Sequence, residues 1–249
     1  MSERRVALVT GASYGIGQAC AVALARDGCD VVVTDLRAET LSETEARIAG
    51  AGGRSLALAL DVRSQASVEG AMTAAIEKFG RVDVLVNNAG VPLKRMALDM
   101  TREEWDGVLS VNLTGAFFMS QQMGRHLVGT KRPGCIVNIA STFAMIGIAE
   151  RAAYGISKAA VAHMAKMLAV EWAEHGIRVN AVAPGTVETA SRAPGLADPV
   201  RRKSVMGKIP LGRFGKAEEI AAAVCYLASP AAEFVTGHTL VVDGGTTVD

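Results

Sequence analysis

Tyr154 and Lys158 are a pair whose types and spacing suit acid–base chemistry. They stand four positions apart in an alanine-rich stretch that favours a helix. A spacing of four puts both side chains on one helix face, one turn apart. A free tyrosine has a pKa of about 10, and a nearby ammonium lowers this pKa because it favours the phenolate. The pair therefore indicates a phenol that exchanges a proton near neutral pH.

Ser141 adds a hydroxyl to the same region of the chain. It follows an apolar run at 134–140 that we expect to form a buried strand, and Tyr154 comes thirteen residues later. Ligands of parallel sheets lie beyond the carboxyl ends of the strands, so both side chains are expected at one site. Neighbours on an extended segment point to opposite sides, so only one of Ser141 and Thr142 should face a substrate. We expect Ser157 to be a hydroxyl on the helix surface.

A glycine-rich turn near the N-terminus indicates a phosphate site. An apolar run at 5–9 predicts a strand, the turn Thr10–Gly17 follows, and an apolar helix is expected over 18–26. Glycines let the backbone approach a pyrophosphate closely, and a helix N-terminus offers unpaired N–H groups. The glycines stand at 11, 15 and 17, which differs from the usual G-x-G-x-x-G fingerprint. A plain glycine turn is the alternative, and the strand–turn–helix context favours the phosphate site.

Asp35 predicts which dinucleotide would bind there. It ends an apolar run eighteen residues after Gly17. A carboxylate about 20 residues beyond the turn holds the adenosine ribose hydroxyls and would repel a 2′-phosphate. Tyr14, and not a lysine or arginine, stands in the turn, and Arg37 is the only nearby cation that argues for NADP. The balance predicts NAD.

These motifs together resemble the short-chain dehydrogenase/reductase family over nearly the whole chain. The turn Thr10–Gly17 matches the family's cofactor loop, and Asp61-Val62 matches its adenine contact after the third strand. Asn87-Asn88-Ala89-Gly90 matches the N-N-A-G segment after the fourth strand, and Pro184-Gly185-Thr186 matches the loop that closes beside the nicotinamide. The resemblance implies four catalytic residues, Asn112, Ser141, Tyr154 and Lys158. It implies cofactor binding by Gly11, Ser13, Tyr14, Gly15, Ile16, Gly17, Asp35, Leu36, Asp61, Val62, Asn88, Ala89, Gly90, Tyr154, Lys158, Pro184, Gly185, Thr186, Val187 and Thr189.

The resemblance also implies how the four catalytic residues divide the work. Hydride moves between a substrate carbon and nicotinamide C4, which is the cofactor's own chemistry. Ser141 would bond the substrate oxygen, and Tyr154 would take the alcohol proton in oxidation and return it in reduction. Lys158 would lower the tyrosine pKa and hold the ribose hydroxyls. Asn112 would anchor a water that relays protons to Lys158; the alternative is a residue at a helix kink, since asparagine disfavours helix interiors.

Alternating strands and helices are expected to position these residues. Seven apolar runs predict strands at 5–9, 30–35, 55–60, 82–87, 134–140, 178–183 and 239–242. They show little polar alternation, which is typical of parallel strands buried on both faces. With helices between them, they predict one domain over 1–249, a Rossmann-type doubly wound α/β sheet with helices on both faces. The long irregular stretch at about 184–216 holds four of the seven prolines and is expected to be a substrate lid.

Composition excludes several other classes of protein. The formal net charge is +1 and no basic stripe is visible, so no nucleic-acid partner is expected. The apolar runs are shorter than the ~20 residues of a membrane span. No signal peptide is visible and the four cysteines are scattered, which predicts reduced thiols and a cytoplasmic protein. The four histidines have no metal-ligand spacing, so no metal site is expected.

Several cations adjoin the predicted site. Arg95, Arg151 and Arg192 are candidates for recognising an anionic group, together with Thr142 as a polar substrate contact. The alternative is that these cations lie on solvated surface, and this reading is favoured for Arg201–Lys203. Few aromatic residues occur in the lid, so a small polar secondary alcohol is expected, such as a sugar, polyol or hydroxy acid.

The sequence as a whole predicts an NAD-dependent oxidoreductase. Within the family, a 3-oxoacyl-carrier-protein reductase is the alternative, since Ile209–Phe214 and Val241–Gly245 resemble segments of those enzymes. Outside it, a nucleotide-binding regulator without catalysis is the alternative, although the serine, tyrosine and lysine are all present. The segment Tyr154–Ala173 is apolar around much of its circumference, which suggests a subunit partner. The resemblance implies a homotetramer.

Overall fold

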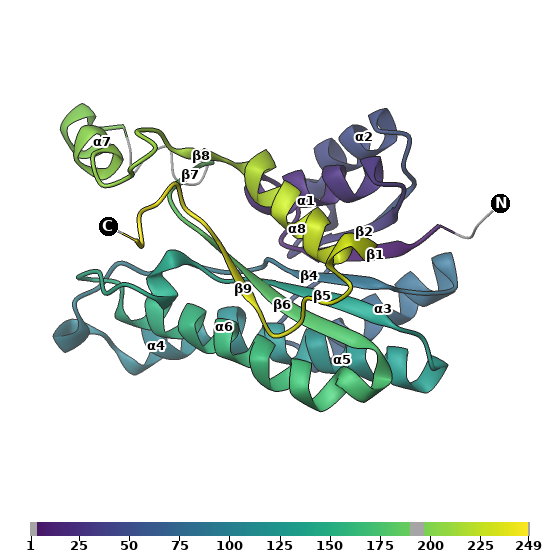
Figure 1. The fold of residues 1–249 in the computed structure, drawn as a ribbon. Helices are drawn as coiled ribbons and strands as arrows, with labels where there is room; N and C mark the ends of the chain where they lie inside the picture. Colours follow the sequence, from purple (N-terminus) through teal and green to yellow (C-terminus); the bar gives the residue numbers. More distant parts are fainter. Residues whose placement is uncertain (1–3, 190–196, 249) are drawn as a thin grey trace.

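A seven-stranded parallel sheet forms the centre of the structure (Figure 1), a computed structural model that describes residues 4–189 and 197–248. Its strands lie in the order β3, β2, β1, β4, β5, β6, β9. Every neighbouring pair is parallel. The strand bounds are β1 Val6–Thr10, β2 Asp30–Asp35, β3 Ser55–Ala59, β4 Val84–Asn87, β5 Gly134–Ile139, β6 Ile177–Pro184 and β9 Thr239–Val242. The predicted doubly wound sheet is confirmed, and each expected strand agrees with the structure to within two residues.

The order of the strands creates a crevice at one edge of the sheet. From β1 the chain steps outward through β2 to β3, and it then returns to the other side of β1 to form β4. In such sheets ligands bind outside the carboxyl ends of the strands, where the order reverses. The ends of β1, β2, β4 and β5 therefore define where a functional site is expected.

Helices cover both faces of the sheet (Figure 1). α1, α2 and α8 lie on one face, and α3, α4, α5 and α6 lie on the other. Leu24 and Ile220 belong to the core of the first face, and Met119 and Leu168 to the core of the second. The helix bounds are α1 Gly15–Arg26, α2 Ser42–Gly50, α3 Gln65–Phe79, α4 Arg102–Leu109, α5 Ala116–Thr130, α6 Ala152–Trp172 and α8 Ala217–Ala228.

Local sequence signals fix several helix ends. The Thr101 hydroxyl accepts from the Glu104 amide, and the Glu104 carboxylate accepts from the Thr101 amide, a reciprocal cap that starts α4. Gly80 and Gly176 follow helices with φ of 78° and 69°, in the left-handed region that favours glycine.

The segment after β6 is more ordered than the sequence suggested. β7 (Val187–Glu188) pairs with β8 (Gly215–Lys216), and helix α7 (Pro199–Met206) lies between them. The Asp198 side chain caps α7 by accepting from the Val200 amide, and Pro199 has its φ already set for the first helical turn. The expectation of an irregular stretch throughout 184–216 is therefore wrong for α7 and for the β7–β8 pair. Figure 1 shows α7 standing beyond the edge of the sheet.

None of the helices in the described ranges is both long enough and apolar enough to span a bilayer.

Candidate active site at the carboxyl edge of the sheet

The glycine turn after β1 forms a tight cradle. Gly11 and Gly15 have φ of 64° and 63°, which a residue with a side chain adopts at a cost. A Cβ on Gly17 would lie 2.2 Å from the Gly11 carbonyl oxygen, so only glycine fits there. α1 begins at Gly15 with no side-chain cap, which leaves its first N–H groups directed at the cradle. Close backbone approach and unpaired N–H donors fit the pyrophosphate of a dinucleotide.

The segment after β4 holds this cradle in place. The Asn88 side-chain amide donates to the carbonyls of Thr10 and Gly11, at 3.0 and 2.7 Å. The Thr10 hydroxyl accepts from the backbone amides of Asn88 and Ala89, both at 3.0 Å. Two neighbouring strand ends are thus joined by four hydrogen bonds, and the turn is fixed before any ligand arrives.

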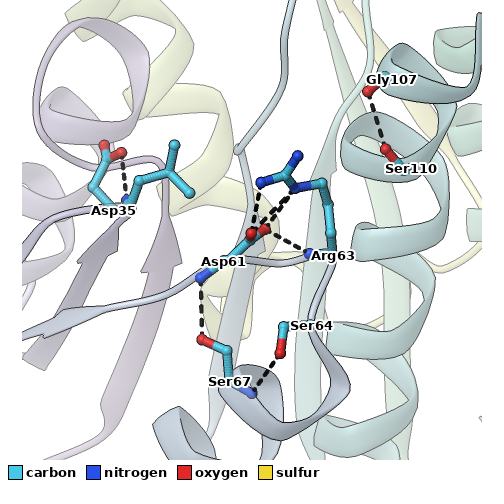
Figure 2. Close-up of polar contacts among 8 residues, drawn as sticks. Asp35, Asp61, Arg63, Ser64, Ser67, Gly107 and Ser110 are labelled. Carbon is cyan, nitrogen blue, oxygen red and sulfur yellow. Dashed lines mark hydrogen bonds and ion pairs between the residues drawn. The ribbon is translucent and has the colours of Figure 1, made fainter. Parts of the chain in front are cut away.

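Asp35 at the end of β2 lies beside the cradle. Its carboxylate accepts from the Ser13 hydroxyl at 2.5 Å, from the Ser13 amide at 3.2 Å and from the Leu36 amide at 2.8 Å. Figure 2 shows the last of these contacts. The side chains of Tyr14 in the turn and of Leu36, the next residue after Asp35, are exposed. The sequence prediction placed Asp35 next to the turn but missed its bond to Ser13.

Asp61, after β3, faces the same end of the sheet (Figure 2). Its carboxylate pairs with the Arg63 guanidinium through bonds of 2.7 to 3.1 Å, and Arg63 lowers the pKa of this carboxyl. The Asp61 amide donates to the Ser67 hydroxyl at 3.1 Å, while Val62 is buried. Sequence reasoning missed Arg63, although an arginine two positions after an aspartate is a visible signal for a local ion pair.

Tyr154 and Lys158 lie one turn apart on α6, as their spacing predicted. The Lys158 ammonium is 5.8 Å from the centre of the Tyr154 ring. It donates to the carbonyl of Ile139, the last residue of β5, at 2.7 Å. Lys158 is buried, and burial lowers its pKa to about 8 because an apolar surrounding disfavours the charged form. A lysine poised near neutral pH next to a phenol suits proton exchange.

Ser141 and Thr142 follow β5 and are both buried. The Ser141 hydroxyl oxygen accepts from the Phe143 amide at 3.2 Å, which leaves its proton for another acceptor. The Phe143 ring packs edge-on against the Tyr154 ring, with centres 6.0 Å apart. This contact holds the tyrosine next to the strand end that carries Ser141.

Asn112 lies in a π-helical turn, Ser110–Gly115, between α4 and α5. Its side chain accepts from the Val91 amide at 2.7 Å and donates to the Val91 carbonyl at 3.1 Å. It also donates to the Ser157 hydroxyl at 3.0 Å, so the prediction that Ser157 is a surface hydroxyl is wrong. Ser157 is fully buried because this face of α6 packs on the π-helical turn. Single π turns inside helices are frequent at functional sites.

Gly90 brings Asn112 and Lys158 to one place. A Cβ on Gly90 would lie 3.3 Å from Asn112 Oδ1 and 3.4 Å from Lys158 Nζ. The end of the N-N-A-G segment thus runs between these two polar groups. The structure therefore brings Asn112, Ser141, Tyr154 and Lys158 together at the carboxyl edge of the sheet.

The loop after β6 closes the other side of the crevice. The Gly185 amide donates to the Val242 carbonyl at 3.0 Å, and a Cβ on Gly185 would lie 2.8 Å from Asp243 Cα. The chain then passes through Thr186 to Thr189, whose methyl group lies 3.4 Å from the place of a Cβ on Gly15. This loop therefore runs from the sheet edge to the phosphate cradle. A small cavity lies beside this loop. It is lined by Thr186, Leu211, Arg213, Gly215, Glu219, Ile220, Val242, Asp243 and Gly244.

The predicted substrate arginines differ in what they contact. Arg95 forms a forked ion pair with Glu104, with Nη2 2.5 Å from Oε1, so its guanidinium is already neutralised. Arg151 uses one nitrogen to donate to the Leu93 carbonyl at 3.0 Å. Arg192 lies outside the described residues. These contacts weaken the prediction of anion recognition for Arg95 and leave it open for Arg151.

Metal ligands do not gather at this site. Across residues 4–189 and 197–248, no group of three histidine, cysteine, aspartate or glutamate side chains is arranged to hold a metal ion.

Comparison with known proteins agrees with this geometry. A family model described as enoyl-(acyl carrier protein) reductase matches residues 11–247. The 2-dehydro-3-deoxy-D-gluconate 5-dehydrogenase of Escherichia coli (strain K12) is 37% identical over 243 residues, covering 98% of this chain and 95% of the relative. The NAD-dependent glycerol dehydrogenase of Listeria innocua is 38% identical over 244 residues, covering 98% and 94%.

Solved structures extend the comparison to the fold. A crystal structure named as a candidate 2-deoxy-D-gluconate 3-dehydrogenase from Agrobacterium tumefaciens, with bound NADP, has a TM-score of 0.93 and 41% identity. The match covers 100% of this chain and 98% of that one. The chain therefore belongs to the short-chain dehydrogenase/reductase family and is an oxidoreductase that acts on CH–OH groups.

Proposed function

We propose that the protein is an NAD-dependent dehydrogenase of small polar secondary alcohols, such as sugars, polyols or hydroxy acids. The observation that carries this proposal is the placement of Asp35 beside the glycine cradle, at the same sheet edge as Tyr154 and Lys158. The cradle suits a dinucleotide, the carboxylate suits an unphosphorylated ribose, and the tyrosine–lysine pair suits proton exchange with an alcohol.

Each side chain has a distinct part in this mechanism. The Ser141 hydroxyl bonds the substrate oxygen, while the Tyr154 phenolate takes the alcohol proton in oxidation and the resulting phenol returns it in reduction. Lys158 lowers the tyrosine pKa through its charge and holds the ribose hydroxyls of the cofactor. Asn112 anchors a water that relays protons to Lys158. The nicotinamide supplies the hydride chemistry when bound.

The cofactor is expected to lie across the edge of the sheet. Its pyrophosphate would lie on the glycine cradle, its adenosine between Asp35 and Asp61, and its nicotinamide beside Pro184–Thr189. The assignment of NAD depends on Asp35, because a second negative charge at the ribose would be repelled by the carboxylate. Among similar proteins, the Listeria innocua enzyme is NAD-dependent and the Agrobacterium tumefaciens structure holds NADP, so the choice must be measured for this chain.

The substrate class is proposed from chemistry and from the names of similar proteins. Two of the similar proteins are named for sugar acids and one for a polyol. We place the substrate under a lid formed by about 184–216 within a single domain, 1–249. Arg151 and Arg192 are the proposed contacts for an anionic group, since a guanidinium matches a carboxylate in shape and charge.

The enzyme is proposed to assemble as a homotetramer. Met167 and Val170 on α6 are 52% and 81% exposed, and Phe117 and Phe118 on α5 are each 37% exposed. Exposed apolar side chains on α5 and α6, which cover the same face of the sheet, suit a subunit interface. A cytoplasmic location suits the four free cysteines, because thiols stay reduced there.

A substrate screen tests the proposal. Reduction of NAD+ would be followed with neutral polyols, sugar acids and sulfonated analogues, and oxidation of NADPH with an acetoacetyl thioester. Turnover of a polyol or sugar acid with NAD+ is expected. Arg151→Ala should weaken the binding of an anionic substrate more than that of a neutral one. Activity confined to the thioester with NADPH would favour a 3-oxoacyl reductase. Cofactor binding without any turnover would favour the regulator.

A further inference from the structure

The hydrogen bond between Ser13 and Asp35 joins the phosphate-binding turn to the carboxylate at the end of β2. The Ser13 hydroxyl lies 2.5 Å from Asp35 Oδ2, within the range of a charge-assisted O–H···O⁻ bond. The Ser13 amide donates to the same oxygen at 3.2 Å. The two residues stand 22 positions apart, so the fold and not the local chain brings them together.

The position of Ser13 is fixed from its other side as well. Its carbonyl accepts from the side-chain amide of Gln18 at 3.3 Å, and that amide also donates to the Thr44 hydroxyl at 3.0 Å. Thr44 in turn donates to the Ala12 carbonyl at 2.8 Å. Gln18 and Thr44 are buried, so this network is shielded from water. The Ser13 side chain is therefore held against Asp35 in advance of binding.

Counting lone pairs shows what this pair offers to a ligand. A carboxylate only accepts hydrogen bonds, so the Ser13 hydroxyl must supply the proton of the 2.5 Å bond. Oδ2 takes two donors from Ser13, while Oδ1 takes one from Leu36 and keeps one lone pair. With its only proton engaged, the Ser13 oxygen offers lone pairs alone. The side chains of Ser13 and Asp35 therefore present only acceptors. They can accept hydrogen bonds from ribose hydroxyls, and they offer no donor to a phosphate.

We propose that Ser13 is a specificity-determining residue whose proton Asp35 withholds from the ligand. Asp35 then excludes a 2′-phosphate in two ways, through its own charge and by keeping the neighbouring hydroxyl from donating. This inference depends on the proposed dinucleotide site and explains its selectivity. Removal of the carboxylate frees the Ser13 proton, which then donates to a 2′-phosphate. Ser13 changes from a partner of NAD to a partner of NADP when Asp35 is absent.

A double-mutant cycle on binding tests this proposal. Dissociation constants for NAD+, NADP+, 5′-AMP and adenosine 2′,5′-bisphosphate would be measured by calorimetry for wild type, Ser13→Ala, Asp35→Ala and the double variant. In the wild-type background, Ser13→Ala should raise the dissociation constant of NAD+ about 5-fold, as expected for the loss of one hydrogen bond. The dissociation constant of NADP+ should change by less than about 2-fold. In the Asp35→Ala background, Ser13→Ala should weaken NADP+ and the bisphosphate about 5-fold. Thr40→Val, which removes an exposed hydroxyl after β2, is the matched control.

The outcomes separate this proposal from the function on which it depends. If Ser13→Ala weakens NAD+ and NADP+ equally in both backgrounds, the serine only shapes the turn and the inference fails. If the wild type prefers NADP+, the NAD assignment fails. The role of Ser13 is still decided by whether Ser13→Ala weakens NADP+ binding more in the Asp35→Ala background than in the wild-type background. Retained melting temperatures of the variants exclude unfolding as the cause of any loss.

Discussion

The side chain of Asn112 is linked through Ser157 to the backbone of Tyr154. Asn112 Nδ2 donates to Ser157 Oγ at 3.0 Å, and Ser157 Oγ donates to the Tyr154 carbonyl at 2.7 Å. The π-helical turn Ser110–Gly115 is thereby fastened to the turn of α6 that carries the proposed proton donor. Asn112 thus has a structural part in the site in addition to its proposed relay of protons.

The first prediction concerns this link. Asn112→Ala should lower the free energy of unfolding by about 3 kcal/mol, because it removes three hydrogen bonds, two to the backbone of Val91 and one to Ser157. Ser157→Ala should cost less, about 1–2 kcal/mol, since it removes the bonds to Asn112 and to the Tyr154 carbonyl and leaves the Val91 contacts intact. Urea unfolding measures both. Equal costs for the two variants would contradict the argument.

The second prediction concerns the phenol of Tyr154. Tyr154→Phe removes only the hydroxyl and keeps the ring contact with Phe143, so turnover should fall at least about 1,000-fold while NADH binding survives. Lys158→Ala should weaken both turnover and binding, because Lys158 has two proposed roles. Steady-state rates and NADH fluorescence titrations separate the effects. Substantial activity in Tyr154→Phe would refute the mechanism.

The third prediction concerns the burial of Lys158. Its pKa falls from 10.5 to about 8 in the folded, cofactor-free protein. Between these two values the unfolded chain binds more protons, so the free energy of unfolding rises as pH rises through this window. The gain amounts to about 3 kcal/mol for a shift of this size.

Lys158→Met is the control for this prediction. Urea unfolding at pH 7.5 and pH 10 should show the wild type gaining stability relative to Lys158→Met, since other groups that titrate in this range are common to both proteins. Below pH 8 the difference should be flat. If the free energy of unfolding changed equally with pH in both proteins, burial would not shift the pKa of Lys158.

The sequence predicted the fold more fully than the contacts inside the site. Strands such as Val31–Val33 are buried on both faces, so apolar runs alone locate them. The cap at Thr101 and the stop at Gly80 depend on near neighbours and are equally visible. In contrast, the bonds Ser13–Asp35 and Asn112–Ser157 span 22 and 45 positions, and no local pattern encodes them. They follow only once strand order and helix packing are known.

The fourth prediction concerns assembly. Val170 on α6 is 81% exposed and lies one turn from Met167 on the proposed interface. Val170→Glu should lower the assembly state at micromolar concentration, because it places a charge in an apolar contact. Leu98→Glu, at a residue that is 97% exposed outside α5 and α6, is the control. Light scattering that finds a stable wild-type monomer would contradict the tetramer.

The fifth prediction concerns the glycine cradle. A Cβ on Gly17 would lie 2.2 Å from the Gly11 carbonyl oxygen and 2.5 Å from the Asn88 side-chain nitrogen, so Gly17→Ala must displace the turn. We expect NAD+ affinity to fall at least about 100-fold, because the displaced backbone can no longer approach the pyrophosphate.

Gly70→Ala is the matched control for the cradle. Gly70 lies within α3 and a Cβ there meets nothing within 4 Å, so the same substitution should raise stability by about 0.5–1 kcal/mol and leave binding unchanged. Calorimetric titration with NAD+ and urea unfolding of both variants give the comparison. The cradle would lose its assigned role if Gly17→Ala bound NAD+ as the wild type does while remaining folded.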